Sequence, residues 1–243
     1  MGCRSSYNAR VPPATSSVHT ISITSHGRYW VRPAFGHPVG LLVGSHGYAQ
    51  SAESFASDLE AIPGVERWLL VSVQGLHRFY TRAGAVVASW MTSQDRELMI
   101  ADNTAYLRQV VARVRTEQAA VLGTSAPLVF LGFSQGVAMA FRAAAGHPDD
   151  CAGIIALGAD VPPDVRAATT SLPPVLLGRG STEAWYTEER MQSDVAWMRG
   201  IGADLTLCEY AGGHEWTNAF REAAGAFLSR VAQSRPRGAN AQA

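Results

Sequence analysis

The sequence predicts a single α/β domain built on a mainly parallel, doubly wound sheet with helices on both faces. Short apolar segments recur along the chain without polar alternation, which is typical of strands that are covered on both faces. Amphipathic helical segments lie between them, and this alternation favours a parallel sheet with helical crossovers. The chain has 243 residues, 47% of them hydrophobic, which suits one domain with a sizeable core.

The start of the chain predicts an antiparallel edge to this sheet. Residues 1–18 are mostly small or polar and are expected to form a flexible lead-in. Residues 19–25 and 29–32 then alternate apolar and polar side chains on either side of His26-Gly27. This pattern predicts an antiparallel N-terminal hairpin.

The remaining elements follow from the apolar runs and from helical spacing. We predict strands at residues 39–43, 68–73, 128–132, 153–157, 175–178 and 205–209. Helices are expected at 97–115, 187–199 and 220–231, where apolar residues recur three or four positions apart. The longest stretch without either pattern, 74–93, is expected to be a functional or mobile loop. The domain should span residues 19–233, followed by a flexible tail at 234–243.

The charge and cysteine content argue against several classes of function. The 20 basic residues, all arginine, are scattered and balanced by 20 acidic ones, so we expect no nucleic-acid partner. No apolar run approaches the roughly 20 residues that span a bilayer, and residues 1–20 lack the apolar core of a signal peptide. We therefore expect a cytoplasmic protein without stable membrane insertion. Three irregularly spaced cysteines (Cys3, Cys151, Cys208) predict neither a disulfide framework nor a metal site.

The strongest chemical signal is Gly132-Phe-Ser134-Gln-Gly136, which joins a predicted strand to an alanine-rich helical segment. Gly-x-Ser-x-Gly in this context is typical of a nucleophile elbow, where the serine hydroxyl projects from a tight, strained turn. The two glycines lack the Cβ atoms that would collide with the neighbouring strand and helix. The helix N-terminus places partial positive charge where an oxyanion would form. We therefore predict that Ser134 is a catalytic nucleophile.

A serine hydroxyl needs a general base, and His214 is the best candidate. It follows the last predicted strand, after two glycines that permit a tight loop, and the order serine, acid, histidine is that of the α/β-hydrolase fold. The acid should follow a strand between Ser134 and His214. Glu183 is the first choice and Asp160 the second, with two less favoured acidic residues, Asp164 and Glu188.

The second oxyanion donor of such a fold comes from the loop after an early strand. Here that loop is Gly44-Ser-His46-Gly-Tyr48, so we predict the backbone N–H groups of Tyr48 and Gln135 as the two donors. His46 is expected to be a packed structural histidine. Trp90, Trp185 and Trp216 lie near predicted catalytic loops and are candidates for substrate binding, although packing over helix ends would explain them equally well.

These motifs resemble the phospholipase/carboxylesterase family, which includes acyl-protein thioesterases and bacterial carboxylesterases. The resemblance rests on His46-Gly47 with Glu53-Ser-Phe55, on the Gly-Phe-Ser-Gln-Gly elbow, and on Tyr210-x-Gly-Gly-His214-Glu-Trp216. It implies hydrolysis of an ester or thioester through an acyl-enzyme, without a cofactor. No histidine or cysteine cluster has the spacing of metal ligands, so we expect no metal. The family usually has aspartate at the acid position, where this chain has Glu183 in Gly180-Ser-Thr-Glu.

The resulting hypothesis is a serine carboxylesterase that acts on small-molecule esters with small to medium acyl groups. A thioesterase or lysophospholipase, and a peptidase or acyltransferase with the same triad, are the enzymatic alternatives. A ligand-binding relative of the fold is the non-enzymatic one. Such a relative would be expected to have a broken triad, whereas Ser134 and His214 are both present.

Overall fold

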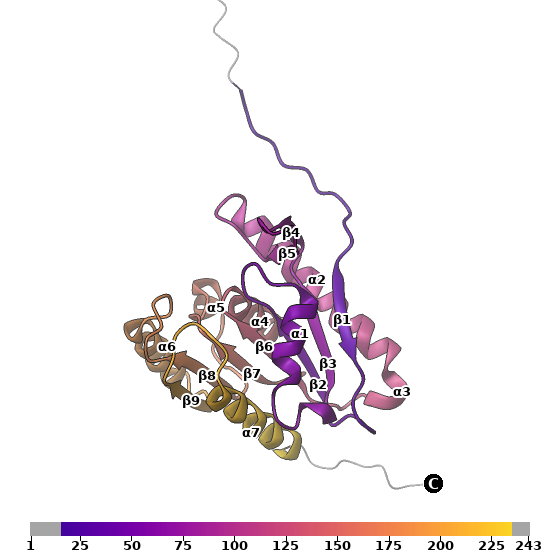
Figure 1. The fold of residues 1–243 in the computed structure, drawn as a ribbon, viewed down its shortest axis with the longest axis vertical. Helices are drawn as coiled ribbons and strands as arrows, with labels where there is room; N and C mark the ends of the chain where they lie inside the picture. The colour runs from indigo at the N-terminus through magenta and orange to yellow at the C-terminus, as the bar shows by residue number, and fades with distance from the viewer. Residues whose placement is uncertain (1–15, 235–243) are drawn as a thin grey trace, which may run out of the picture.

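The computed structural model describes residues 16–234, and its centre is a seven-stranded sheet in the order β1-β3-β2-β6-β7-β8-β9 (Figure 1). The strands are β1 (Arg28–Arg32), β2 (Leu41–Ser45), β3 (Leu69–Gln74), β6 (Leu128–Phe133), β7 (Cys151–Leu157), β8 (Val175–Gly180) and β9 (Leu205–Tyr210). Only β1 is antiparallel to its neighbour; the other strands run parallel. The predicted fold class is confirmed, and each of the six predicted apolar strands lies within two residues of an observed one.

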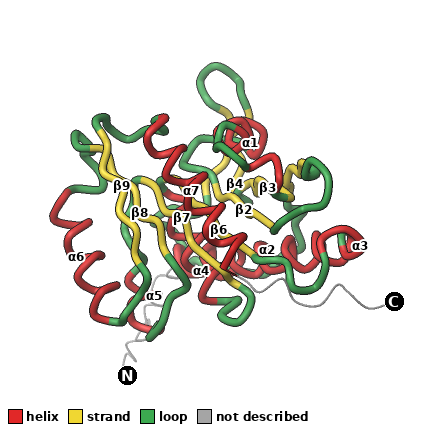
Figure 2. Tube along the Cα trace, turned by 90° about the horizontal axis from the view of Figure 1, so that it is seen from below, coloured by secondary structure: helices red, strands yellow, loops and turns green. Residues whose placement is uncertain are grey.

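Helices cover both faces of the sheet (Figure 2). They are α1 (Ala52–Glu60), the 3₁₀ turn η1 (Val65–Arg67), α2 (Arg96–Glu117), α3 (Ala119–Leu122), α4 (Gln135–Ala145), α5 (Pro163–Ala168), α6 (Glu188–Gly200) and α7 (Asn218–Ser234). Side chains of α2, α4, α5 and α6 pack into one core cluster, and those of α1 and α7 pack into the other. The predicted apolar face of α2 is buried at Leu107, Val111 and Val114.

The predicted N-terminal hairpin is only half present. β1 forms and is antiparallel, but it pairs with β3, while residues 16–27 contain no strand and the beginning of this segment extends away from the body of the domain (Figure 1). Tyr106 of α2 lies against Gly27, where an added Cβ would be 2.0 Å from the ring. The Tyr106 hydroxyl donates to the Arg28 carbonyl at 2.6 Å. The chain therefore crosses over α2 at Gly27, and residues 19–25 do not return to pair with β1.

The predicted loop at 74–93 contains regular structure. Gln74 ends β3, and the next residues form a hairpin of β4 (His77–Tyr80) and β5 (Val86–Ser89) outside the main sheet. The turn of this hairpin closes with the Thr81 N–H donating to the Ala85 carbonyl at 2.9 Å. An isolated bridge between Gln50 and Ala88 joins the hairpin to the loop after β2.

The parallel sheet brings the loops of interest to one edge. Ser45 at the end of β2 pairs in register with Gly132 of β6, and Gly180 at the end of β8 pairs with Tyr210 of β9. The segments that follow β2, β6, β8 and β9 therefore emerge at the carboxyl end of the sheet, where ligands bind in open α/β folds. The predicted lead-in and tail lie outside the described residues, apart from 16–18 and Ser234. Within the described chain, no helix is both long and apolar enough to cross a membrane.

Candidate active site

Ser134 occupies a strained turn between β6 and α4. Its backbone has φ 52° and ψ −122°, a conformation that side-chain-bearing residues rarely adopt and that is often found at functional sites. Its N–H donates to the Leu157 carbonyl at the end of β7, at 2.8 Å. This bond fixes the turn to the neighbouring strand and leaves the serine side chain partly exposed.

The glycines on either side of Ser134 are required by close backbone approach. A Cβ on Gly136 would lie 1.9 Å from the Ser45 carbonyl oxygen, and one on Gly132 would lie 2.4 Å from the Gly136 carbonyl oxygen. Neither glycine could therefore carry a side chain without moving β2 or α4. This is the crowding expected of a nucleophile elbow.

His214 and Glu183 form a direct pair. The Nδ1 atom of His214 lies 2.5 Å from Oε2 of Glu183. The other carboxylate oxygen, Oε1, accepts the N–H of Trp185 at 2.7 Å. The Glu183 side chain is fully buried, whereas the His214 side chain keeps 26% of its surface exposed. The carboxylate therefore holds Nδ1 and leaves Nε2 as the other polar atom of the ring.

Hydrogen bonds between the two loops explain how a glutamate reaches the histidine. The Ser181 N–H donates to the Tyr210 carbonyl at 2.8 Å, and the Thr182 N–H donates to the Gly212 carbonyl at 2.9 Å. The Thr182 hydroxyl donates to the same Gly212 carbonyl at 2.8 Å. These bonds continue the pairing of β8 and β9 past the strand ends. The turn that follows brings the Glu183 carboxylate to Nδ1 of His214.

The pair lies beside the elbow. The His214 ring packs against Phe133, with ring centroids 5.0 Å apart. It also lies over Gly158, where an added Cβ would be 3.1 Å from Cε1 of His214. Gly158 follows Leu157, whose carbonyl binds the Ser134 N–H. The Ser134 hydroxyl has no hydrogen-bond partner among residues 16–234. The hydrogen bond between a catalytic serine and its general base is often long or poorly aligned before the substrate binds.

The other acidic candidates are engaged elsewhere. Asp160 is half exposed, with its carboxylate 3.9 Å from Arg190. Asp164 accepts two hydrogen bonds from Arg142, at 2.7 and 2.8 Å, and this guanidinium lowers the pKa of the carboxyl. Glu188 accepts from the Gln192 side chain within α6 at 3.0 Å. Of the four acidic candidates, only Glu183 contacts His214.

The two predicted oxyanion donors have free N–H groups. The Gly47 N–H donates to Oε1 of Gln50 at 2.7 Å, and the Ala49 N–H donates to the Ala88 carbonyl at 3.0 Å. The N–H of Tyr48, between them, has no partner within the described chain, and neither has that of Gln135 at the start of α4. Both segments border the elbow, since a Cβ on Gly47 would lie 3.1 Å from the Phe133 ring.

His46 is a structural residue, as expected. Its side chain is buried, with Nδ1 2.6 Å from the Gly47 carbonyl and Nε2 accepting the N–H of Gly75 at 3.0 Å. Burial lowers the pKa of His46 to about 4. A neutral ring that donates from Nδ1 and accepts at Nε2 satisfies both contacts.

The structure places the three candidate tryptophans in different environments. Trp90 is completely buried, so its prediction as a substrate-binding residue is corrected: its ring packs on His46 and Nε1 donates to the His46 carbonyl at 2.8 Å. Trp216 is partly exposed and packs against Phe55 and Phe133, with centroids 6.2 and 6.1 Å away. Trp185 is 75% exposed and stands beside Glu183, to which its backbone N–H donates.

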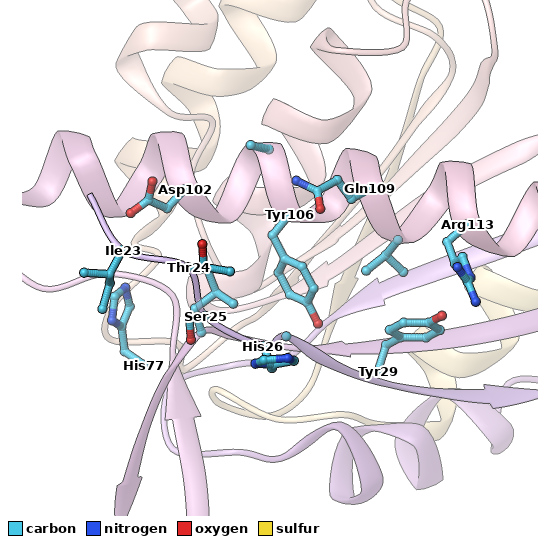
Figure 3. A pocket seen from close by; sticks show the side chains of 14 residues that line it. Ile23, Thr24, Ser25, His26, Tyr29, His77, Asp102, Tyr106, Gln109 and Arg113 are labelled. Carbon is cyan, nitrogen blue, oxygen red and sulfur yellow. The ribbon is translucent and has the colours of Figure 1, made fainter. Parts of the chain in front are cut away.

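A hollow of about 950 Å³ lies away from these residues, between the segment that precedes β1 and helix α2 (Figure 3). Tyr106 stands in its middle, with Asp102 and Arg113 at either side along the helix and His77 across from Asp102 (Figure 3). None of Ser134, Glu183 and His214 lines it, so it is not the cavity of the candidate site. Within residues 16–234, no group of three or more His, Cys, Asp or Glu side chains could hold a metal ion.

Sequence reasoning missed the side-chain role of Gln135. Its amide makes hydrogen bonds to the segment after β5, although only its backbone was considered in the prediction. The sequence offered only an amide next to the predicted nucleophile as a signal, because the partners of this amide lie more than 40 residues away in the chain.

Solved structures of similar fold include esterases and a thioesterase. Acyl-protein thioesterase 2 of Zea mays superimposes with a TM-score of 0.68 at 17% identity, covering 85% of this chain and all of that chain. Esterase PE8 gives 0.67 at 22% identity, with coverages of 85% and 100%. A carboxylesterase from Mesorhizobium loti gives 0.67 at 17% identity, with coverages of 84% and 94%. No curated protein sequence matches the chain.

These identities are low, so the structural likeness establishes the fold. The family follows from a comparison that uses the sequence itself. The family model described as Phospholipase/Carboxylesterase matches residues 39–231, which include every residue of the candidate site. The chain therefore belongs to the phospholipase/carboxylesterase family of α/β-hydrolases.

Proposed function

We propose that this protein is a serine carboxylesterase with Ser134 as nucleophile, His214 as general base and Glu183 as the acid that orients His214. The backbone N–H groups of Tyr48 and Gln135 form the oxyanion hole. The observation that carries the proposal is the buried carboxylate of Glu183, 2.5 Å from Nδ1 of His214 and next to a serine in a strained turn. A carboxylate on Nδ1 selects the tautomer whose Nε2 accepts a proton from serine.

The reaction then proceeds in two stages. As the Ser134 oxygen attacks the ester carbonyl carbon, its proton moves to Nε2 of His214, and the carbonyl oxygen becomes an oxyanion bound by the two N–H groups. The carbon–oxygen bond to the alcohol breaks, and the alcohol leaves with the proton from Nε2. Water then attacks the acyl-enzyme, gives a proton to Nε2 and releases the carboxylic acid, while Ser134 regains its hydrogen.

Small to medium acyl groups are the proposed substrates. Ser134 is partly exposed, and two aromatic residues of the adjoining loops, Tyr48 and Trp185, are 61% and 75% exposed. An open site of this kind buries little of a long acyl chain, and each buried CH₂ would add about 0.8 kcal/mol to binding. Acyl groups of about two to eight carbons should therefore bind nearly as tightly as longer ones, because further CH₂ groups would remain in solvent.

Thioester hydrolysis is the second candidate. The same acyl-enzyme chemistry cleaves a thioester, and one of the similar folds is that of an acyl-protein thioesterase. The two functions separate when kcat/KM is compared for an oxygen ester and a thioester with the same acyl group. A preference for the thioester of more than about tenfold, equivalent to about 1.4 kcal/mol in the transition state, would favour the second candidate.

The proposal is tested by Ser134→Ala with a p-nitrophenyl short-chain ester. Loss of the nucleophile should reduce kcat by about 10⁵–10⁶, leaving only the contribution of the oxyanion hole and of binding. The matched control is Ser57→Ala, which removes an exposed hydroxyl from α1 and should leave kcat unchanged. A Ser134→Ala variant that kept more than about a few per cent of the activity would disprove the assignment.

A further inference from the structure

Residues at the end of β5 and just after it are bonded to Gln135 and to the loop that carries Tyr48. Trp90, fully buried, donates its backbone N–H to Oε1 of Gln135 at 2.9 Å and its indole N–H to the His46 carbonyl at 2.8 Å. Its own carbonyl accepts from the Asn103 side chain at 2.8 Å. Trp90 is therefore bonded to the start of α4, to the loop after β2 and to α2.

Both polar atoms of the Gln135 side chain form hydrogen bonds to this segment. Nε2 donates to the Met91 carbonyl at 2.8 Å, while Oε1 also lies 3.2 Å from the Ser89 hydroxyl. The side chain thus bonds to three consecutive residues of one segment, and the backbone N–H of the same residue stays free. Rotating or shortening this amide would release the first turn of α4 from its neighbour.

The loop after β2, which carries Tyr48, is bonded to the same segment. Ala88, at the end of β5, accepts the Ala49 N–H at 3.0 Å and donates to the Gln50 carbonyl at 2.9 Å. The His46 ring packs on Trp90 with a centroid distance of 5.1 Å. The Tyr48 ring stacks on Phe79 of β4 at 5.4 Å. The loop that carries Tyr48 is therefore bordered by the β4–β5 hairpin along its length.

We propose that residues 88–91 set the spacing between the two oxyanion donors, with the Gln135 side chain and Trp90 as positioning residues. This inference rests on the proposed function. An oxyanion hole works only when both donors lie 2.7–3.1 Å from the developing charge, and they must be held there before the reaction. Here one donor lies on the loop after β2 and the other at the start of α4, and the 88–91 segment is bonded to the Gln135 side chain and to residues on both sides of Tyr48.

Gln135→Met tests the role of the amide, because methionine has a similar length and makes none of these hydrogen bonds. The donors remain but are no longer held, so kcat should fall by about 10- to 100-fold, less than when a donor is removed outright. KM should change by less than about threefold, since the interaction matters mainly in the transition state. The inhibition constant of an acyl trifluoromethyl ketone, whose adduct with serine places an oxyanion in the hole, should rise by the same factor as kcat falls.

Two further variants separate positioning from general stability. Trp90→Phe keeps the backbone bond to Gln135 but removes the donor to the His46 carbonyl, so a smaller loss of about three- to tenfold is expected, again matched by the ketone. Val231→Ala removes buried methyl groups from the far end of α7 and should lower the melting temperature without changing kcat. All assays are run well below the melting temperatures of the variants.

The outcomes distinguish this inference from the proposed function. If Gln135→Met keeps kcat within about twofold, or loses activity without weaker binding of the ketone, the positioning role is overturned while the esterase assignment stands. If Val231→Ala loses as much activity as Gln135→Met at equal stability, the positioning role is overturned too. A wild-type protein that neither hydrolyses esters nor binds the ketone would overturn the proposed function itself.

Discussion

Replacing Glu183 by glutamine keeps the shape of the side chain but reverses what it offers to His214. In the native site Oε1 accepts the Trp185 N–H, and Oε2 faces Nδ1 of the imidazole. A glutamine would keep its oxygen on the Trp185 N–H and turn its amide nitrogen toward Nδ1. That arrangement favours the tautomer with the proton on Nε2, which cannot accept the proton of Ser134.

The magnitude follows from the charge that is lost. The Glu183 carboxylate is fully buried and touches the ring that becomes an imidazolium in the proposed reaction. Opposite charges about 4 Å apart attract by about 4 kcal/mol at an effective dielectric constant of about 20. At about 1.4 kcal/mol for each tenfold in rate, this corresponds to about 10³. We expect kcat to fall by about 10²–10⁴ with little change in KM.

The assay compares Glu183→Gln with Asp160→Asn by steady-state hydrolysis of a p-nitrophenyl ester. Asp160 is the matched control, because it was the second candidate for the acid and its half-exposed carboxylate pairs only weakly, with Arg190 at 3.9 Å. Asp160→Asn should retain kcat within about twofold, as expected for a surface ion pair. The reasoning is refuted if Asp160→Asn is the variant with the large loss of kcat, or if Glu183→Gln keeps more than about a tenth of the wild-type activity.

Three further predictions concern stability, geometry and substrate. Because burial lowers the pKa of His46 from 6.5 to about 4, the unfolded chain binds a proton that the native chain excludes. Native stability should therefore fall by about 3 kcal/mol between about pH 7 and pH 4 through this residue. Urea unfolding of the His46→Gln variant should not show this loss of stability between about pH 7 and pH 4. The His37→Gln variant, a control at an exposed position, should show it. Gly158→Ala should reduce kcat about tenfold, because its Cβ would lie 3.1 Å from the His214 ring, and the positive φ of 75° adds strain measurable as a lower melting temperature. A Gly158→Ala enzyme with wild-type kcat would contradict the placement of His214. Across p-nitrophenyl esters, kcat/KM should peak between about two and eight acyl carbons, and a steady rise to about sixteen would contradict the open site.

The parts of the fold that were predictable depend on local pattern. Buried parallel strands have continuous apolar runs, so 128–132 and 175–178 could be recognised within two residues of the observed strands. The phospholipase/carboxylesterase family was also identified from motifs, and the family model confirms it. The strained turn at Ser134 has its own local signature, since Gly132 and Gly136 are needed there.

The errors involve contacts between distant segments. Residues 19–25 have the alternation of a strand, but Tyr106, about 80 residues later, occupies the space at Gly27 where the chain would have to turn. Trp90 was a candidate for substrate binding, with packing an equal alternative, because it lies near a predicted catalytic loop in the sequence. Its burial depends on the His46 carbonyl and the Gln135 amide, both more than 40 residues away. Neither contact leaves a pattern in the local sequence.

The assignment of Glu183 also depends partly on local sequence and partly on contacts between distant segments. Its position after a predicted strand made it the first candidate, but the sequence alone left Asp160 open. The choice depends on pairing between the loops after β8 and β9, in which the Thr182 N–H donates to the Gly212 carbonyl. Spacing along the chain does not encode that pairing.

The most direct test of the central claim is covalent labelling with a fluorophosphonate, followed by peptide mass spectrometry. The account predicts one adduct on the peptide that contains Ser134, no adduct in Ser134→Ala, and much slower labelling in Glu183→Gln. An adduct on another residue, or an active esterase that the fluorophosphonate neither labels nor inhibits, would contradict it.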